Sequence, residues 1–188
     1  CERGVSIKRG GRRGRTRSGR LAALDDWLAS GPILSGQVFP QVVDLGLGDE
    51  PTTTIELFHR LQTSISGVRV IGVDHELSRV ERAQAEAVDG LRFVVDSFGL
   101  QSILSPVHVI RVCNVLREYS VQEAIEARRR LGRTLVDGGW LIDATSSTNG
   151  HVCVALLMQR ANEKLHRRAL WFYTNRAQGF SPIMLRNY

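Results

Sequence analysis

A short apolar run that ends in an acid and two glycines constrains this chain more than any other feature. The run QVVDLG at 41–46 is typical of a buried parallel strand, and Gly46 and Gly48 predict a tight turn after it. Pro51 suits the first position of a helix, and the threonines at 52–54 offer hydroxyls to the free amides of its first turn. The segment therefore predicts a strand that passes through a glycine turn into a helix.

The same alternation continues along the chain. Ser120 and Glu123 form a capping-box pattern that opens one of the helices, and only a short connection is expected at 98–104. The pattern predicts an α/β fold, a Rossmann-like doubly wound, mostly parallel sheet with helices on both faces. We expect further strands at 68–74, 91–96, 107–113, 140–145 and 169–174, and further helices at 21–30, 78–88, 120–136 and 151–166.

Length and composition indicate one domain. The chain has 188 residues, of which 43% are hydrophobic, enough for one substantial core. Both ends look like cut ends, so we expect the sheet to be truncated at its last strand, with SPIMLRNY at most the beginning of a seventh. The longest apolar run, VCVALLM, is shorter than the ~20 residues of a membrane span, and residues 1–20 lack the apolar core of a signal peptide. We therefore expect a cytoplasmic protein without a membrane partner, and the three scattered cysteines indicate neither a metal site nor disulfides.

The net charge of +6 is concentrated at the N-terminus. Residues 1–20 contain eight basic residues and one acid, a net charge of +7, whereas the remainder contains 17 basic and 18 acidic residues, a net charge of −1. A segment rich in Gly and Arg with few apolar residues cannot bury a core. We expect 1–20 to be a flexible basic arm and 21–188 to be the folded domain. The arm is either a solvated tail or a contact to RNA phosphates.

Two acids mark a candidate ligand site at the strand ends. Asp44, Gly46 and Gly48 lie where an open parallel sheet places its ligands, next to a helix N-terminus that favours an anionic group. Asp74 ends the next strand, where a carboxylate can accept both hydroxyls of a ribose. Alone, the glycines could serve an ordinary connection and Asp74 could cap a helix. Together these features predict a ligand that contains a nucleoside.

The details of the turn discriminate between nucleoside cofactors. A dinucleotide fingerprint needs a third glycine where this chain has Pro51, and no Gly-Lys-Ser/Thr follows the strand as in a phosphate-binding loop. Nicotinamide dinucleotides are therefore disfavoured, and a P-loop is excluded.

These residues resemble the Rossmann-like class I S-adenosylmethionine-dependent methyltransferases, over about Val42 to Thr174. VVDLGLG resembles the first motif of that family, VIGVD the second, FVVDSF the third and RVCNVLREY the fourth. DLGLGDEPTTTIEL with RVCNVLREY is most similar to a bacterial subgroup whose acceptor the sequence does not identify. Glu50 stands where many members have a third glycine, and the fourth motif lacks the Pro-Pro pattern of base-modifying enzymes.

The resemblance implies S-adenosylmethionine as the cofactor and gives each motif residue a role. Asp44 would lie near the amino end of the cofactor, with Gly46 and Gly48 in close approach. Asp74 would bind the ribose hydroxyls, with His75 beside the adenine. Asp96 would accept from the adenine amino group, and Ser97 and Phe98 would line the adenine ring. Arg111 and Asn114 would lie where cofactor and substrate meet.

The implied reaction is methyl transfer by in-line displacement to a small-molecule or macromolecular acceptor, which needs alignment more than acid–base chemistry. Glu118, Tyr119 and His151 follow the fourth and fifth strands and could assist as a base, although ordinary surface or packing roles account for each. No catalytic residue is assigned. Two alternatives remain: an NAD(P)-dependent oxidoreductase of Rossmann fold, and a non-catalytic RNA-binding module that uses the basic arm.

Overall fold

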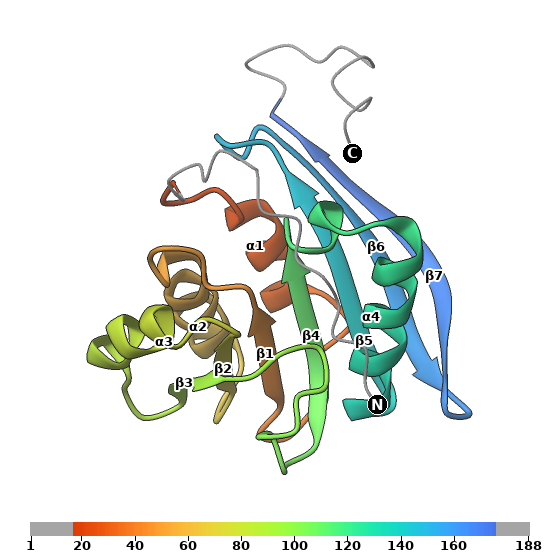
Figure 1. The fold of residues 1–188 in the computed structure, drawn as a ribbon, viewed down its shortest axis with the longest axis horizontal. Coiled ribbons are helices and arrows are strands. Elements are labelled where there is room, and N and C mark those ends of the chain that lie inside the picture. The colour runs from red at the N-terminus through yellow and green to blue at the C-terminus, as the bar shows by residue number, and fades with distance from the viewer. Residues whose placement is uncertain (1–16, 176–188) are drawn as a thin grey trace.

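The computed structural model describes residues 17–175, which form a seven-stranded sheet with helices on both faces (Figure 1). The strand order is β3-β2-β1-β4-β5-β6-β7. Residues 1–16 of the arm predicted at 1–20, and the terminal segment SPIMLRNY, lie outside the described residues. The strands are β1 (Gln41–Leu45), β2 (Arg69–Asp74), β3 (Leu91–Val95), β4 (Val107–Cys113), β5 (Leu135–Ser146), β6 (Val152–Ala161) and β7 (Lys164–Thr174).

Parallel pairing of the first five strands creates the edge on which a ligand site can form. β1 pairs in parallel with β2 on one side and with β4 on the other, so the order of the strands reverses at β1. β2 with β3 and β4 with β5 are also parallel, whereas β6 and β7 are antiparallel to their neighbours. The mostly parallel sheet is confirmed. Its reversal point places the carboxyl ends of β1, β2 and β4 side by side.

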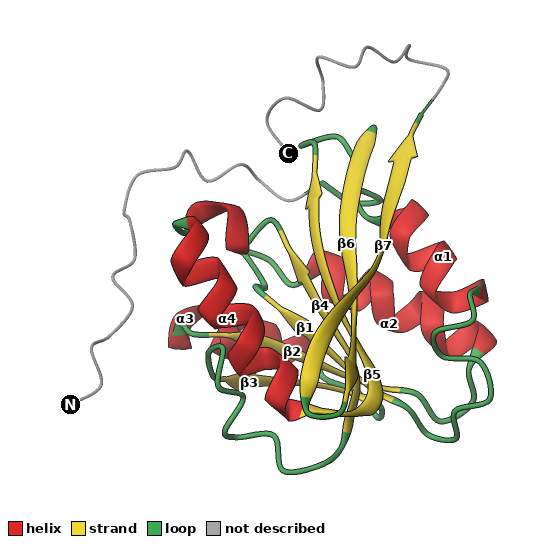
Figure 2. Ribbon diagram, turned by 90° about the vertical axis from the view of Figure 1, so that its right-hand side faces the viewer, coloured by secondary structure: helices red, strands yellow, loops and turns green. Residues whose placement is uncertain are grey.

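Helices cover both faces of the sheet, as expected. Figure 2 shows α4 (Val121–Thr134) on one side and α1 (Ala22–Ser30) and α2 (Thr52–Ser64) on the other. The short α3 (Leu77–Ala83) contributes its buried side chains to the same core as α1 and α2. Burial of each large aliphatic side chain contributes about 1.5–3 kcal/mol. The fully buried members from α1, α2 and α4 are Leu24, Leu28, Leu57, Leu61 and Leu131.

The helix predicted at 151–166 is wrong, because β6 and the start of β7 occupy this segment. Asn162 and Glu163 both have positive φ, 51° and 62°, the conformation of a two-residue hairpin turn of type I′. β6 buries side chains on both faces, so its first seven residues, VCVALLM, are all apolar and show no alternation. A short run of this kind does not distinguish a strand from a buried helix.

The other predicted elements exist and differ mainly at their ends. β5 begins at Leu135, directly after α4, rather than at 140, and the helix expected at 78–88 ends at Ala83 before a 3₁₀ turn at Gln84–Glu86. The short connection expected at 98–104 is confirmed. Within 17–175, none of the helices combines the length and apolar character needed to cross a bilayer.

The capping box at the start of α4 is confirmed and yields a stability prediction. Ser120 Oγ accepts from the Glu123 backbone N–H at 3.3 Å, and the Glu123 carboxylate accepts from the Ser120 N–H at 2.9 Å.

Replacing Ser120 with Ala should lower the free energy of unfolding by about 1 kcal/mol in urea titrations, because an amide loses its partner. Ser30→Ala removes an exposed hydroxyl that only donates to the Asp26 carbonyl, and should change stability by less than about 0.5 kcal/mol. Equal losses in the two variants would contradict the capping role.

Candidate functional site

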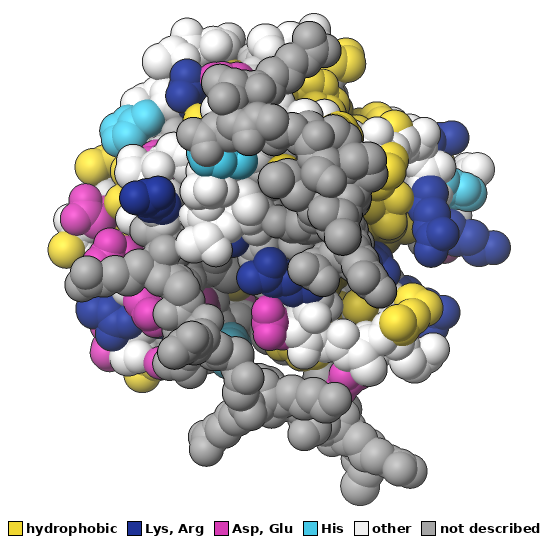
Figure 3. Space-filling model, turned by 90° about the horizontal axis from the view of Figure 1, so that it is seen from above, with side chains coloured by type: hydrophobic (Ala, Val, Ile, Leu, Met, Phe, Trp, Pro, Cys, Tyr) yellow, Lys and Arg dark blue, Asp and Glu magenta, His cyan; other side chains and the backbone are white. Residues whose placement is uncertain are grey.

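The glycine turn joins the carboxyl ends of three strands. Gly46 and Gly48 follow β1 with φ of +101° and +70°, a region that favours glycine. The Gly46 N–H donates to the Val73 carbonyl of β2 at 2.8 Å. A Cβ on Gly46 would lie 2.4 Å from Cγ2 of Val115, beyond the end of β4. Backbone conformation and packing therefore both require glycine at 46. Figure 3 views this end of the molecule, where charged side chains of both signs lie.

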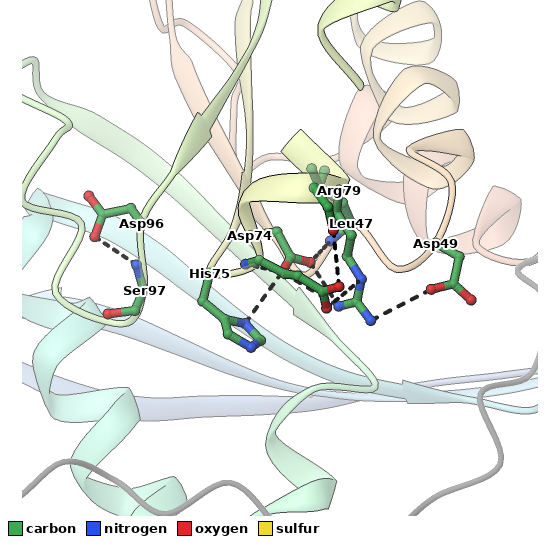
Figure 4. A network of polar contacts seen from close by, with 9 residues as sticks. Leu47, Asp49, Asp74, His75, Arg79, Asp96 and Ser97 are labelled. Carbon is green, nitrogen blue, oxygen red and sulfur yellow. Dashed lines mark hydrogen bonds and ion pairs between the residues drawn. The ribbon is translucent and has the colours of Figure 1, made fainter. Parts of the chain in front are cut away.

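The carboxylate of Asp74 lies at the centre of a polar network beside this turn (Figure 4). Its side chain is 1% exposed, and its two oxygens accept from backbone amides on both sides. The N–H of Leu47, inside the glycine turn, donates to Oδ2 at 3.0 Å, and the N–H of Glu76 donates to Oδ1 at 3.0 Å. Two side chains, His75 and Arg79, complete the network. Asp74 therefore fixes the glycine turn to the end of β2.

Asp96 directly follows the neighbouring strand, β3, and organises the loop there. Its Oδ1 accepts from the Ser97 N–H at 2.7 Å, and its Oδ2 accepts from the N–H and the hydroxyl of Ser102. Burial acts to raise the pKa of Asp96, but the hydrogen bonds from Ser102 and Ser97 outweigh it and lower that pKa. The loop then presents Phe98, whose ring meets Tyr119 edge to face at 5.3 Å. Asp74 and Asp96 thus stand on adjacent strand ends with an aromatic pair near them.

Asp44 and Arg111 lie beneath the turn in a buried ion cluster. The fully buried guanidinium of Arg111 donates from Nε and Nη2 to both oxygens of Asp44 at 2.8 Å, and Nη2 also donates to the Thr53 carbonyl. Its Nη1 pairs with Asp25 of α1, a partner that the sequence did not indicate. The Thr54 hydroxyl donates to Asp44 at 2.6 Å. α2 has no side-chain cap, so the hydroxyls expected to accept from its free amides do not do so. The cluster connects β1, β4, α1 and α2.

Asn114 closes the end of β4 with an unusual backbone. Its φ is +60°, a conformation that Asn adopts more readily than most residues. The side-chain amide donates to Ser146 Oγ at 3.1 Å and accepts from the Ser146 N–H at 3.0 Å. Asn114 is therefore at the predicted strand end, where its side chain joins β4 to β5.

Residues 18–20, at the end of the predicted arm, also reach these strand ends. The Ser18 hydroxyl and the Gly19 N–H donate to Glu56 of α2 at 2.6 and 2.9 Å. Arg20 donates from Nε to Ser146 Oγ at 2.9 Å and from Nη2 to the Ser146 carbonyl at 3.0 Å. The described end of the basic segment therefore spans from α2 to the end of β5. Its Gly- and Arg-rich composition gave no signal for this contact.

The three residues considered as bases have other partners. Glu118 pairs with Arg117 at 3.2 Å, and Nδ1 of His151 lies 3.0 Å from the Asn149 amide. Burial, followed by the charges of Glu123 and Asp74, raises the pKa of Tyr119, so its phenol stays protonated at neutral pH. Within residues 17–175, no group of His, Cys, Asp and Glu has the arrangement of a metal site.

Three solved methyltransferase structures share the fold of this chain. The plantazolicin methyltransferase BamL, solved with SAH, superimposes with a TM-score of 0.54 at 14% identity over 70% of this chain and 47% of its own. Mitomycin 7-O-methyltransferase MmcR gives a TM-score of 0.51 at 16% identity over 66% of this chain and 36% of its own. Coclaurine N-methyltransferase gives 0.51 at 18% identity over 66% and 35%.

These similarities establish the fold. The chain has the Rossmann-like fold of class I S-adenosylmethionine-dependent methyltransferases. It spans less than half the length of each of the three proteins. No protein-family model and no curated protein sequence matches the chain.

The buried cluster predicts a specific pH dependence. Burial is the largest influence on Asp25 and, against the opposing charge of Arg111, raises its pKa to about 6; its Oδ2 has no hydrogen-bond partner. Because the folded pKa exceeds the ordinary aspartate value of 3.8, the stabilisation is fully present below about pH 3.8 and is lost as the pH rises through 6. Between pH 4.5 and 7, the wild type should lose about 2 kcal/mol of unfolding free energy relative to Asp25→Asn.

Urea titrations at the two pH values measure this difference. Asp26→Asn is the matched control, because Asp26 lies beside Asp25 on the same helix but is exposed and paired with Arg60. That variant should follow the wild type. Parallel stability profiles for the wild type and Asp25→Asn would contradict the assignment.

Proposed function

We propose that this chain is the cofactor-binding core of an S-adenosylmethionine-dependent methyltransferase. The observation that carries the proposal is the buried carboxylate of Asp74 at the end of β2, fixed by the amides of Leu47 and Glu76. A carboxylate in this position has the geometry to receive the two hydroxyls of a ribose. Its connection to the glycine turn makes the two parts of the predicted nucleoside site a single unit.

The residues around Asp74 suit the other parts of this cofactor. The positive φ values of Gly46 and Gly48 leave backbone without a Cβ for the methionine end. Asp96, Ser97 and Phe98 follow the neighbouring strand, and we assign them to the adenine together with His75. Asp44, Arg111 and Asn114 have their side chains in internal contacts, so we assign them to positioning of the turn and of the end of β4.

The charges beside the turn favour this cofactor over a nicotinamide dinucleotide. Asp49 and Glu50 directly follow Gly48, and both are exposed. The charge of Asp49 is partly offset by Arg79, at 3.6 Å, whereas no ion pair of Glu50 is found among the described residues. The Glu50 carboxylate would repel the doubly charged pyrophosphate of a dinucleotide more than S-adenosylmethionine, whose carboxylate is outweighed by its ammonium and sulfonium. Glu50, which occupies the place of a third glycine, extends toward solvent, where its charge is hydrated.

Methyl transfer requires the protein mainly to align the acceptor with the methyl group. S-adenosylmethionine supplies, when bound, a methyl group on a sulfonium sulfur that an acceptor can attack in line. The glycine turn and Asp74 hold the two ends of the site, and the edge-to-face pair of Phe98 and Tyr119 provides an apolar wall. The acceptor, a small molecule or a macromolecule, would approach from beyond the ends of β4 and β5.

Calorimetric titration with S-adenosylhomocysteine tests the proposal. The wild type should bind the ligand, and Asp74→Ala should lose at least about tenfold in affinity, because the ribose hydroxyls lose a charged acceptor. Glu81→Ala changes another carboxylate, exposed on α3, and should bind as the wild type does. A wild type that gives no heat at millimolar ligand would contradict the proposal.

A second titration separates the two classes of enzyme. NADH fluorescence should not change when the wild type is added, because Asp49 and Glu50 lie where a pyrophosphate would have to approach. Saturable NADH binding that S-adenosylhomocysteine does not displace would favour an oxidoreductase instead.

A further inference from the structure

Asp74 has few acceptor positions left for a ribose. A carboxylate offers about four lone-pair directions. The amides of Leu47 and Glu76 take one on each oxygen at 3.0 Å. The remaining two face Arg79, whose Nη1 lies 3.3 Å from Oδ2, and His75, whose Nδ1 lies 3.3 Å from Oδ1. A ribose diol therefore has to replace Arg79 and His75, while the two amides stay.

The two side chains differ in how firmly they are held. His75 is 52% exposed and can turn into solvent. Arg79 is only 13% exposed, and its guanidinium also lies 3.6 Å from Asp49 through Nη2 and 3.3 Å from Glu76 through Nε. Arg79 is therefore the stronger competitor for the carboxylate.

The contacts of Arg79 are nevertheless loose enough to break. Its distances of 3.3–3.6 Å to three carboxylates exceed the usual length of a charge-assisted hydrogen bond, 2.7–2.9 Å. Arg111, in contrast, holds Asp44 with two bonds of 2.8 Å in a fully buried environment. Asp49 and Glu76 also give the Arg79 guanidinium anionic partners after it leaves Asp74. The geometry fits an exchangeable counter-ion better than a structural clamp.

We propose that Arg79 is a specificity-determining residue that competes with the ribose for Asp74. This inference rests on the proposed function, because it assumes that a ribose binds at Asp74. In the free protein Arg79 neutralises the buried carboxylate, and a ligand enters only by displacing the guanidinium toward Asp49 and Glu76. Arg79 therefore lowers affinity for ligands that carry both ribose hydroxyls, and leaves affinity for the adenine portion unchanged.

Titrations with three ligands test the competition. S-adenosylhomocysteine and adenosine should bind Arg79→Met about fivefold to tenfold more tightly than the wild type, since no ion pair has to be broken. The probe 2′,3′-dideoxyadenosine lacks both hydroxyls and should bind the two proteins equally. Arg79→Gln provides a second variant if Arg79→Met is unstable, as judged by circular dichroism and thermal unfolding.

Arg82→Met is the matched control. Arg82 lies on the same helix, is exposed and contacts only the Asp49 carbonyl, at 3.5 Å, so its removal changes the local charge equally without freeing Asp74. Arg82→Met should leave all three affinities within about twofold of the wild type.

Weaker or unchanged binding of S-adenosylhomocysteine by both Arg79 variants, or equal tightening for dideoxyadenosine, would overturn the inference while leaving the proposed function intact. Absence of binding by the wild type and by both Arg79 variants would instead overturn the proposed function.

Discussion

The architecture of the site depends on the ion pairs and hydrogen bonds of the buried Arg111 guanidinium. The guanidinium joins β4 to β1 through Asp44, to α1 through Asp25 and to the start of α2 through the Thr53 carbonyl. Charges in a protein interior carry a desolvation cost that their attraction offsets only when the geometry is good. Removal of the guanidinium would leave the carboxylates of Asp25 and Asp44 buried without a counter-charge and would cost about 3–5 kcal/mol. Such a cluster tolerates little displacement, so the strand end before the glycine turn is held in one position.

The position of that strand end matters because the glycine turn is flexible by composition. Its own residues do not fix its conformation. Gly46 and Gly48 leave the backbone permissive, and its conformation is fixed from outside by Val73, by Val115 and by the carboxylate of Asp74. Asp74 orders the turn through the Leu47 amide. In the proposed function, the same carboxylate also accepts from the ribose hydroxyls.

Much of the fold could be predicted from local pattern. The run QVVDLG, the glycines after it and the capping box of Ser120 and Glu123 each indicate one conformation, and the structure contains all three elements. The segment at 151–166 could not be assigned in the same way. β6 is covered on both faces, which removes the alternation that identifies a strand. The part of β7 before the strand predicted at 169–174 is placed by its pairing with β6.

The candidate site shows the same division between local signals and long-range contacts. Asp74 and Asp96 stand at strand ends, where alternation of strands and helices predicts them. Asp25 and Arg79 carry no such signal, because their importance depends on partners 86 and 5 residues away whose side chains meet only in the folded chain. The contacts of Arg20 with Ser146 likewise arise from a segment whose composition indicates only solvation.

The most direct test of the account is a crystal structure of the protein soaked with S-adenosylhomocysteine. Both ribose hydroxyls should contact Asp74, the methionine end should lie against Gly46 and Gly48, and Arg79 should be turned toward Asp49. A ligand bound elsewhere, or a ribose that does not contact Asp74 while Arg79 keeps its ion pair, would contradict the account.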